Sequence, residues 1–280
     1  MTMLVGWVAV DQRSIASAYI ASDSRFSWSD QWRYDCGRKV FACKYSPDII
    51  AYCGDVLFSS VILSRMVDMI DRGLIYNNHC LSEERRKAIL LHLQKQFATY
   101  PKTALAEKIQ IYHVSRDLDG KFHLYSYAAG SSDKWKSEEI EIDSSRSNVI
   151  FAAGIGKTEF DALYDKYNTE GLSSDTSRNV FQCFCGCLRS MQSSKCGGAP
   201  QLVGLYRVAP SAKEEIRNGL DFGIIADGKR YLLGAEVDKE INGDKIRWYN
   251  EYFEICDGYT LRRKKDAMPQ PNPLLNLATP

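Results

Sequence analysis

The residue with the clearest potential for covalent chemistry is Thr2, the second residue of the chain. A small second residue permits removal of Met1, which would leave a threonine that carries its hydroxyl and a free α-amine together. An α-amine has an ordinary pKa of about 7.7 to 8.0, so it can act as general base for the neighbouring hydroxyl without a histidine. A threonine in second position is common, so this feature alone marks Thr2 only as a candidate nucleophile.

Two charged residues stand at strand ends where they could serve such a nucleophile. Asp23 lies in "IASDSR" at the end of an apolar run, and Lys39 lies in "GRKVFA" at the start of another. A carboxylate and an ammonium beside a terminal threonine hold each other charged and lower the effective pKa of the hydroxyl. Spacing alone favours the simpler interpretation, an ordinary ion pair at a sheet edge.

Gly54 ends the buried run "DIIAYCG" just before a helical pattern starts at Asp55. One explanation is a tight turn, which glycine allows because it has no Cβ. The other is a glycine whose backbone N–H approaches a reacting atom and stabilises negative charge there. Both explanations stay open from the sequence.

Neither a cofactor nor a metal is predicted. The segment "GIGKT" at 154–158 fails the phosphate-loop pattern, because Phe151 stands where that pattern requires glycine. His113 and His123 lie on predicted neighbouring strands with no acid at ligand spacing, so we expect them in surface or cross-strand packing. The cysteines of "FQCFCGC" have one residue between them, whereas zinc-binding pairs have two.

The composition excludes several functional classes. A net charge of +1, from 36 basic and 35 acidic residues, gives no electrostatic footprint for nucleic acid. No apolar stretch approaches the roughly 18 residues that span a bilayer, and the first ten residues do not form a signal peptide. We therefore expect a cytoplasmic protein with no membrane partner, whose nine cysteines are free thiols.

The apolar patterns predict alternating blocks of strands and helices. Two hairpins, at 3–22 and around "KYSP", precede a helix from Asp55 and a second helix from Ser82, the expected N-cap, to Phe97. More strands follow, then a helix capped by Thr158 and another from Ser174 to about Met191. The last predicted strands are "QLVGLYR", "FGIIA" and "YLLGA".

This block order predicts an α+β fold, because each antiparallel sheet must bury one face under a helix pair. Two such halves make a sandwich of sheets with helices outside. We expect one domain over 1–235, followed by a C-terminal extension and tail over 236–280. Trp248, Tyr249 and Tyr252 in that extension are candidate interface anchors.

Several stretches together resemble the proteasome β-subunit family, including the bacterial proteasome-like peptidase that works with an unfoldase ATPase. They are "TMLVGWVAV", "IASDSR", "RKVFACKYSPDIIAYCGD", "VIFAAGIGKTEFDALYDKY" and "CGGAPQLVGLYR", in order over about residues 2–208. The resemblance implies an N-terminal-nucleophile hydrolase fold with four αββα layers, a peptide or other amide substrate, and a homo-oligomer, either ring or dimer. An unfoldase ATPase is a further implied partner.

The resemblance also implies residue roles. Thr2 would be the nucleophile, Asp23 and Lys39 would tune its amine and hydroxyl, and Gly54 would donate its N–H to the oxyanion. Substituting Lys39 by alanine is then expected to abolish activity and leave the fold intact, since Lys39 would supply charge and not packing.

Two departures from the family pattern support a second hypothesis. Ile155 stands where the family has a serine that orients the terminus, and Ser193 stands where an aspartate precedes the small-Gly-Gly turn. A non-catalytic, proteasome-like scaffold or interaction subunit accommodates both changes. Retention of Thr2, Asp23 and Lys39 with Gly54 favours a threonine-type hydrolase, because a scaffold does not need all four.

Overall fold

The computed structural model describes residues 2–28, 32–77, 79–130, 134–170, 174–191, 193–209, 211–212, 215–238 and 245–269. Met1, whose removal the nucleophile hypothesis requires, lies outside the described residues, as does most of the C-terminal tail. The fold is mixed α/β, with antiparallel sheets and four α-helices among the described residues.

The larger sheet begins with the predicted first hairpin, β1 (Met3–Asp11) and β2 (Ser14–Ser22). Its strand order is β10-β1-β2-β11-β14-β15-β16; the short strand β17 also pairs with β14, and β18 pairs with β17. These further strands are β10 (Asn148–Gly154), β11 (Gln201–Tyr206), β14 (Gly219–Ala226), β15 (Lys229–Leu232), β16 (Ala235–Val237), β17 (Trp248–Asn250) and β18 (Ile255–Cys256).

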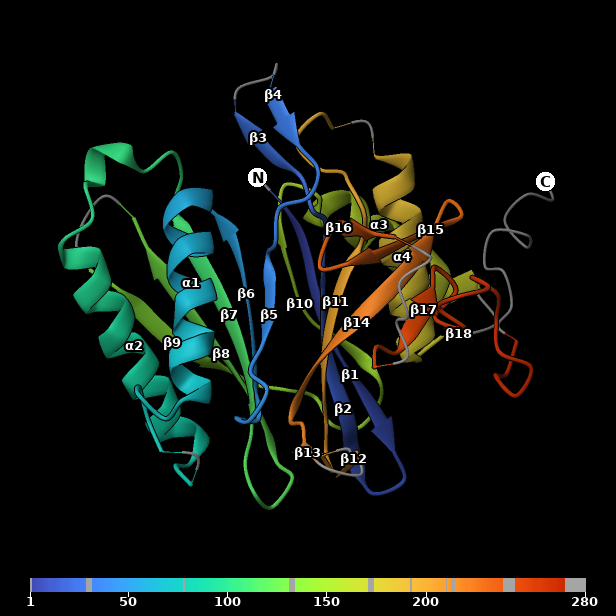
Figure 1. The fold of residues 1–280 in the computed structure, drawn as a ribbon, viewed down its shortest axis with the longest axis horizontal. Helices are drawn as coiled ribbons and strands as arrows, with labels where there is room; N and C mark the ends of the chain where they lie inside the picture. The colour runs from blue at the N-terminus through green and yellow to red at the C-terminus, as the bar shows by residue number, and fades with distance from the viewer. Residues whose placement is uncertain are drawn as a thin grey trace.

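The smaller sheet has the order β5-β6-β7-β8-β9 and is antiparallel throughout. Its strands are β5 (Val40–Ala42), β6 (Asp48–Gly54), β7 (Ile109–Arg116), β8 (Phe122–Ala129) and β9 (Lys136–Ile140). Two separate hairpins complete the strands, β3 (Phe26–Trp28) with β4 (Trp32–Tyr34), and β12 (Ser211–Ala212) with β13 (Glu215–Ile216). The β3–β4 hairpin projects from the upper end of the molecule beside the N-terminus (Figure 1).

The four helices are α1 (Val56–Asp71), α2 (Ser82–Ala98), α3 (Lys157–Glu170) and α4 (Ser177–Ser190), with a 3-10 turn at Lys102–Ala104. Asp55 caps α1 by accepting from the Phe58 N–H at 2.9 Å. Three predicted helix starts are wrong. Leu81 is the N-cap of α2, and the Ser82 hydroxyl donates to Asp117. α3 begins at Lys157, so Thr158 lies inside its first turn, and Thr176 rather than Ser174 precedes α4 as its N-cap.

Apolar side chains pack in three main clusters that follow the helix pairs and sheets. One cluster joins α1 and α2 to the smaller sheet, and a second joins α3 and α4 to β1, β2 and the other strands of the larger sheet. A third lies between the two sheets, with Leu4, Val8 and Ile20 from the larger facing Ile49, Val114 and Leu124 from the smaller. In Figure 1, α1 and α2 flank the sheets on the left, and α3 and α4 lie on the right.

The segment predicted as a C-terminal extension contributes to the larger sheet. β17 pairs in parallel with β14, so that Trp248 lies opposite Gly223. Trp248 and Tyr249 are buried within the chain, whereas Tyr252 is 37% exposed. The expectation that Trp248 and Tyr249 anchor an interface is therefore wrong, because the chain itself covers both rings.

A buried polar network around Asp48 supports the smaller sheet beneath α2. The Asp48 carboxylate lies 2.7 Å from His113 Nε2 and accepts from the Ser115 hydroxyl at 2.6 Å and the Tyr76 hydroxyl at 2.9 Å. Arg85 of α2 lies 3.6 Å away. The expectation that no acid accompanies His113 is wrong, because the pairing of β6 with β7 brings Asp48 to it across the sheet.

Acid should weaken the fold through Asp48. Burial alone would raise its pKa, but hydrogen bonding and charge from His113, with Arg85 and Ser115, lower the pKa below its ordinary value. The resulting stabilisation is present above the unfolded pKa of about 3.9 and is lost as the pH falls below it. We predict that Asp48→Asn lowers the free energy of unfolding by about 3–5 kcal/mol at pH 7.

Urea unfolding between pH 3 and pH 7 measures both effects, and the variant should show a shallower acid-side slope than wild type. Asp68→Asn, on the exposed side of α1, is the matched control and should change neither quantity. Equal losses in the two variants would contradict the role of Asp48.

Candidate active site

Asp23 is the centre of a buried polar cluster at the end of β2. Its Oδ1 accepts from the Lys39 ammonium at 2.7 Å and from the Met3 N–H at 3.1 Å. Its Oδ2 accepts from the N–H groups of Arg25 at 3.3 Å and Gly197 at 3.1 Å. The side chains of Asp23 and Lys39 are both fully buried. A buried carboxylate is stable only with such partners, so four groups from four segments of the chain are fixed around it.

Strand pairing brings Thr2 to this cluster. In the β1–β2 pair Leu4 lies opposite Ser22, and the Asp23 N–H donates to the Met3 carbonyl at 3.2 Å. The bulge of this hairpin lies at Ala9 and Val10, near the opposite end, so the register beside Thr2 is regular. Thr2 is itself fully buried. It thus lies next in the chain to a residue that shares an Asp23 oxygen with Lys39.

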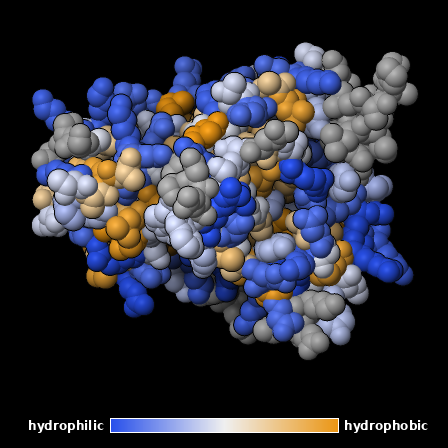
Figure 2. Space-filling view, turned by 90° about the horizontal axis from the view of Figure 1, so that it is seen from above, coloured by the Kyte–Doolittle hydropathy of each residue, from blue (hydrophilic) through white to orange (hydrophobic). Residues whose placement is uncertain are grey.

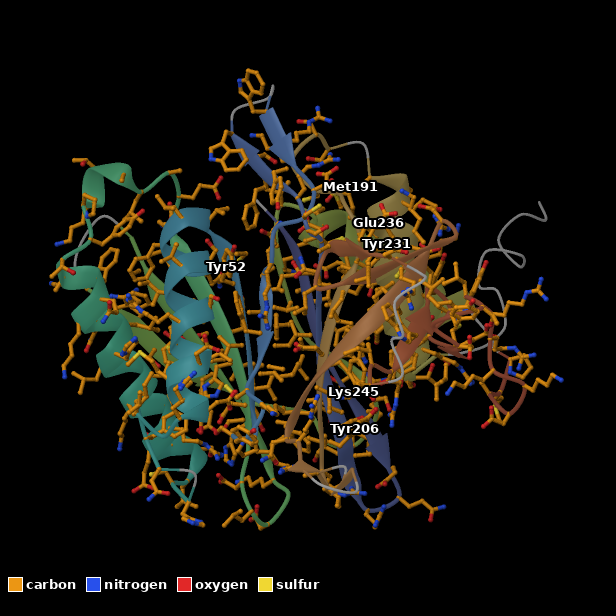
Figure 3. The ribbon with its side chains drawn as sticks, viewed as in Figure 1. Tyr52, Met191, Tyr206, Tyr231, Glu236 and Lys245 are labelled. Atoms are coloured by element: carbon orange, nitrogen blue, oxygen red, sulfur yellow. The ribbon has the colours of Figure 1, made fainter. Side chains whose placement is uncertain are left out.

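Lys39 immediately precedes β5, and its carbonyl accepts from the Tyr52 N–H of β6 at 3.3 Å. Tyr52 marks this region in Figure 3. The sequence-based expectation gave Lys39 a charge but no packing role. The structure corrects it, because the side chain is fully buried and its ammonium also lies 5.9 Å from the centre of the Phe26 ring. Removing this side chain leaves a cavity and an unpaired carboxylate.

The glycines of the "GIGKT" segment allow close approach to Thr2. Gly154 has φ +87°, and a Cβ there would lie 1.9 Å from the Thr2 carbonyl oxygen. The N–H of Gly156 donates to the same oxygen at 3.4 Å. Met191, labelled in Figure 3, lies against Gly156 from the end of α4. This segment therefore positions the backbone of Thr2, while Ile155 between the glycines is 42% exposed.

Gly54 lies two residues beyond Tyr52, at the same end of β6. Its φ is +92°, and a Cβ there would lie 1.8 Å from the carbonyl oxygen of Lys108. Of the two explanations that the sequence left open, the positive φ and this backbone contact support the first, a turn that only glycine allows, and the donor role stays a prediction.

The sequence reasoning missed the residues that hold the surrounding loops together. Arg25 Nε lies 2.6 Å from Asp35 Oδ1, and Arg25 Nη2 lies 2.8 Å from Oδ2. The same guanidinium donates to the carbonyls of Ser194 and Cys196. The hydrogen bond from Arg25 lowers the pKa of Asp35. No sequence pattern identifies Asp35 as the partner of Arg25, because the fold and not the spacing brings the two side chains together.

Gln201 was also missed, although it stands in the "CGGAPQLVGLYR" stretch. Its Oε1 accepts from the Lys39 N–H at 3.0 Å, and its Nε2 donates to the carbonyls of Asp23 at 3.0 Å and Gly37 at 2.8 Å. A single glutamine at the start of a strand belongs to no recognisable sequence motif. Its role is visible only in the folded chain, where Lys39, Asp23 and Gly37 surround it.

Two cysteines near the cluster do not compete as nucleophiles. Burial raises the pKa of Cys53 to about 11 and that of Cys196 to about 12, so both thiols stay protonated at neutral pH. All nine cysteines are free, as expected. Among the residues that the structure describes, no group of three or more His, Cys, Asp or Glu could hold a metal ion.

The fold is similar to that of Anbu (ancestral beta-subunit) from Yersinia bercovieri. The two structures have a TM-score of 0.52 and 13% sequence identity, with 77% of this chain and 86% of that chain covered. The chain has the fold of proteasome-like N-terminal-nucleophile hydrolases.

Two other solved structures show weaker similarity. One is an Anbu (Gly-1) mutant from Hyphomicrobium sp. strain MC1, with a TM-score of 0.49 and 9% identity, covering 84% of this chain and 88% of that chain. The other is eukaryotic HslV from Trypanosoma brucei, with a TM-score of 0.44 and 10% identity, covering 72% of this chain and 99% of that chain. No protein-family model and no curated protein sequence matches the chain. The fold assignment rests on the Yersinia structure.

In the described part of the chain, no helix is both long enough and apolar enough to cross a membrane. The upper end of the molecule, seen in Figure 2, carries apolar side chains scattered among hydrophilic ones.

Substitution of Gly154 should disturb Thr2 directly. Gly154→Ala adds a methyl group 1.9 Å from the Thr2 carbonyl oxygen as well as a strained positive φ. Gly73→Ala is the matched control, because Gly73 has φ +68° and nothing within 4 Å of an added Cβ. The control should cost about 1–2 kcal/mol, the price of left-handed backbone alone, and Gly154→Ala should cost clearly more. Urea unfolding measures the free energy of unfolding of both variants. Equal losses would show that the end of β10 moves away from Thr2 to accommodate the methyl group.

Proposed function

We propose that this protein is a threonine-type N-terminal-nucleophile hydrolase that cleaves amide or peptide bonds after removal of Met1. The observation that carries the proposal is the shared Asp23 Oδ1, which accepts from the Lys39 ammonium and from the Met3 N–H beside Thr2. One carboxylate oxygen thus links the Lys39 ammonium to the backbone next to Thr2.

In the proposed reaction, the Thr2 hydroxyl attacks the substrate carbonyl carbon while the free α-amine of Thr2 takes its proton. The C–N bond then breaks, and the proton passes to the leaving amine. Water hydrolyses the resulting ester and regenerates the hydroxyl. Lys39 lowers the effective pKa of the hydroxyl through its positive charge, and Asp23 keeps Lys39 charged and in place. The N–H of Gly54 donates to the oxyanion.

The proposal includes the finer architecture and setting that the family resemblance implies. The layers are αββα, which the two helix-covered clusters and the inter-sheet cluster support. The protein is a cytoplasmic threonine protease that forms a homo-oligomer, a ring or a dimer. It acts on peptides or other amides, and an unfoldase ATPase is its candidate partner.

A second candidate is a non-catalytic scaffold or interaction subunit. Thr2 is fully buried in the chain that still carries Met1, so that form does not present its hydroxyl to a substrate. The exposed Ile155 replaces an orienting serine, and the Ser193 hydroxyl accepts a local bond from the Lys195 N–H at 3.2 Å. These observations favour a protein that keeps Met1 and binds a partner without hydrolysing a substrate.

Intact mass before and after treatment with an epoxyketone or a β-lactone separates the two functions. For the hydrolase we expect loss of one methionine and one adduct that maps to Thr2. Thr2→Ser should still react, because it keeps a hydroxyl beside the amine, whereas Thr2→Ala should not. Retention of Met1 without an adduct would establish the scaffold instead.

Lys39→Ala should abolish adduct formation and should also destabilise the fold, because it leaves Asp23 as a buried, unpaired charge. We expect a loss of about 3–5 kcal/mol in the free energy of unfolding. The double variant Asp23→Asn with Lys39→Met removes both charges but keeps an oxygen that can accept from the surrounding backbone N–H groups, so it should recover part of that stability and still form no adduct. Thermal unfolding and intact mass measure the two properties separately. An adduct on the folded double variant would exclude the ion pair from the mechanism.

A further inference from the structure

The Asp23–Lys39 ion pair crosses from one sheet to the other. Asp23 follows β2 of the larger sheet, whereas Lys39 precedes β5 of the smaller sheet. A small shift between the two sheets would therefore change the distance between carboxylate and ammonium. Hydrogen bonds between the backbones of the two segments would keep this distance constant without using the charged groups themselves.

Gln201 supplies such a link. It begins β11 and lies opposite Ser22 in the β2–β11 pair, so its backbone belongs to the larger sheet. Its side chain is fully buried and bonds to the backbone on both sides of the pair. It donates to the carbonyl of Asp23, accepts from the N–H of Lys39, and donates to the carbonyl of Gly37 in the same segment as Lys39.

These three bonds use both ends of the amide, which limits the residue types that can replace glutamine. A glutamate at this position would keep the acceptor for the Lys39 N–H but would place a carboxylate against two carbonyl oxygens. An apolar side chain of equal length would leave the N–H and both carbonyls without their partner. Each buried polar group left in this way costs about 1–3 kcal/mol.

A turn from the C-terminal part of the domain covers the Gln201 amide. Gly234, between β15 and β16, has φ +90°, and a Cβ there would lie 2.6 Å from the Ser24 Cβ and 3.3 Å from Gln201 Nε2. Tyr231 and Glu236, which lie opposite each other in that hairpin, are labelled in the upper half of Figure 3. The close approach of this turn shields the amide and its bonds from water.

We propose that Gln201 is a positioning residue for the nucleophile, because it fixes the Lys39 and Asp23 backbones relative to each other. The proposal rests on the hydrolase function proposed above. Gln201 acts through Lys39 and touches no substrate. When its bonds are lost, the ammonium moves away from the terminal amine, whose pKa then rises because a nearby positive charge no longer opposes its protonation.

The test compares Gln201→Met with Gln182→Met. Both variants replace a buried glutamine by a side chain of similar length without hydrogen bonds. Gln182 lies in α4, and its Nε2 donates to the Tyr252 carbonyl at 3.0 Å, away from the ion pair. The rate of β-lactone adduct formation on Thr2 is measured by intact mass from pH 6 to pH 9. For Gln201→Met we expect a rate about 10²-fold lower, with the acid limb of the profile moved to higher pH.

Gln182→Met should leave the rate and the profile of wild type unchanged. A rate loss in Gln201→Met with the wild-type pH profile, or equal losses in both variants, would overturn the positioning role.

A second readout does not depend on hydrolase activity. Lys39 is fully buried in the folded chain, so it should resist an amine-reactive reagent. Peptide mass spectrometry of briefly labelled protein should show faster labelling of Lys39 in Gln201→Met than in wild type and Gln182→Met. If wild type forms no adduct, the hydrolase proposal fails, and this labelling alone decides whether Gln201 holds the ion pair. Equal protection of Lys39 in all three proteins would overturn that role.

Discussion

The buried carboxylate of Asp23 is the constraint on which the upper end of the molecule depends. A charge without solvent must find its partners in the protein, and Asp23 finds an ammonium and three backbone N–H groups. These partners come from β1, from the segment before β5, from the chain just after Asp23 and from the loop before β11. The carboxylate therefore fixes the starting strand, the facing sheet and a distant loop at one point.

Asp48 solves the same physical problem at another place with a different result. It is also fully buried, and its partners are side chains, among them the His113 imidazole and the Ser115 hydroxyl. That network lies within the smaller sheet and under α2. The network at Asp23 lies where the sheets meet and where the chain begins. An acid, a histidine and a serine in contact thus form a structural network in this protein, whereas Thr2, the proposed nucleophile, precedes the residue whose N–H bonds to Asp23.

Glycines give this fold its close backbone contacts. At Gly54, Gly154 and Gly234, a positive φ coincides with a position where a Cβ would overlap a carbonyl or a neighbouring side chain. Each of them ends a strand or makes a turn at the site end of the molecule. At all three positions the requirement that the structure shows is the chain's own packing, which is the turn explanation that the sequence offered for Gly54.

The sequence by itself determined the local elements and the residue types of the site. Apolar periodicity predicted the first hairpin and all four helices, because burial of one face repeats along the chain at a fixed period. It misplaced the N-caps of α2, α3 and α4; at Ser82 the reason is that the hydroxyl bonds to Asp117, a partner that only the fold supplies. Tertiary structure alone decided that Gln201 joins the ion pair, and that Trp248 is covered by its own chain. Those contacts join residues far apart in sequence, so no local period or spacing records them.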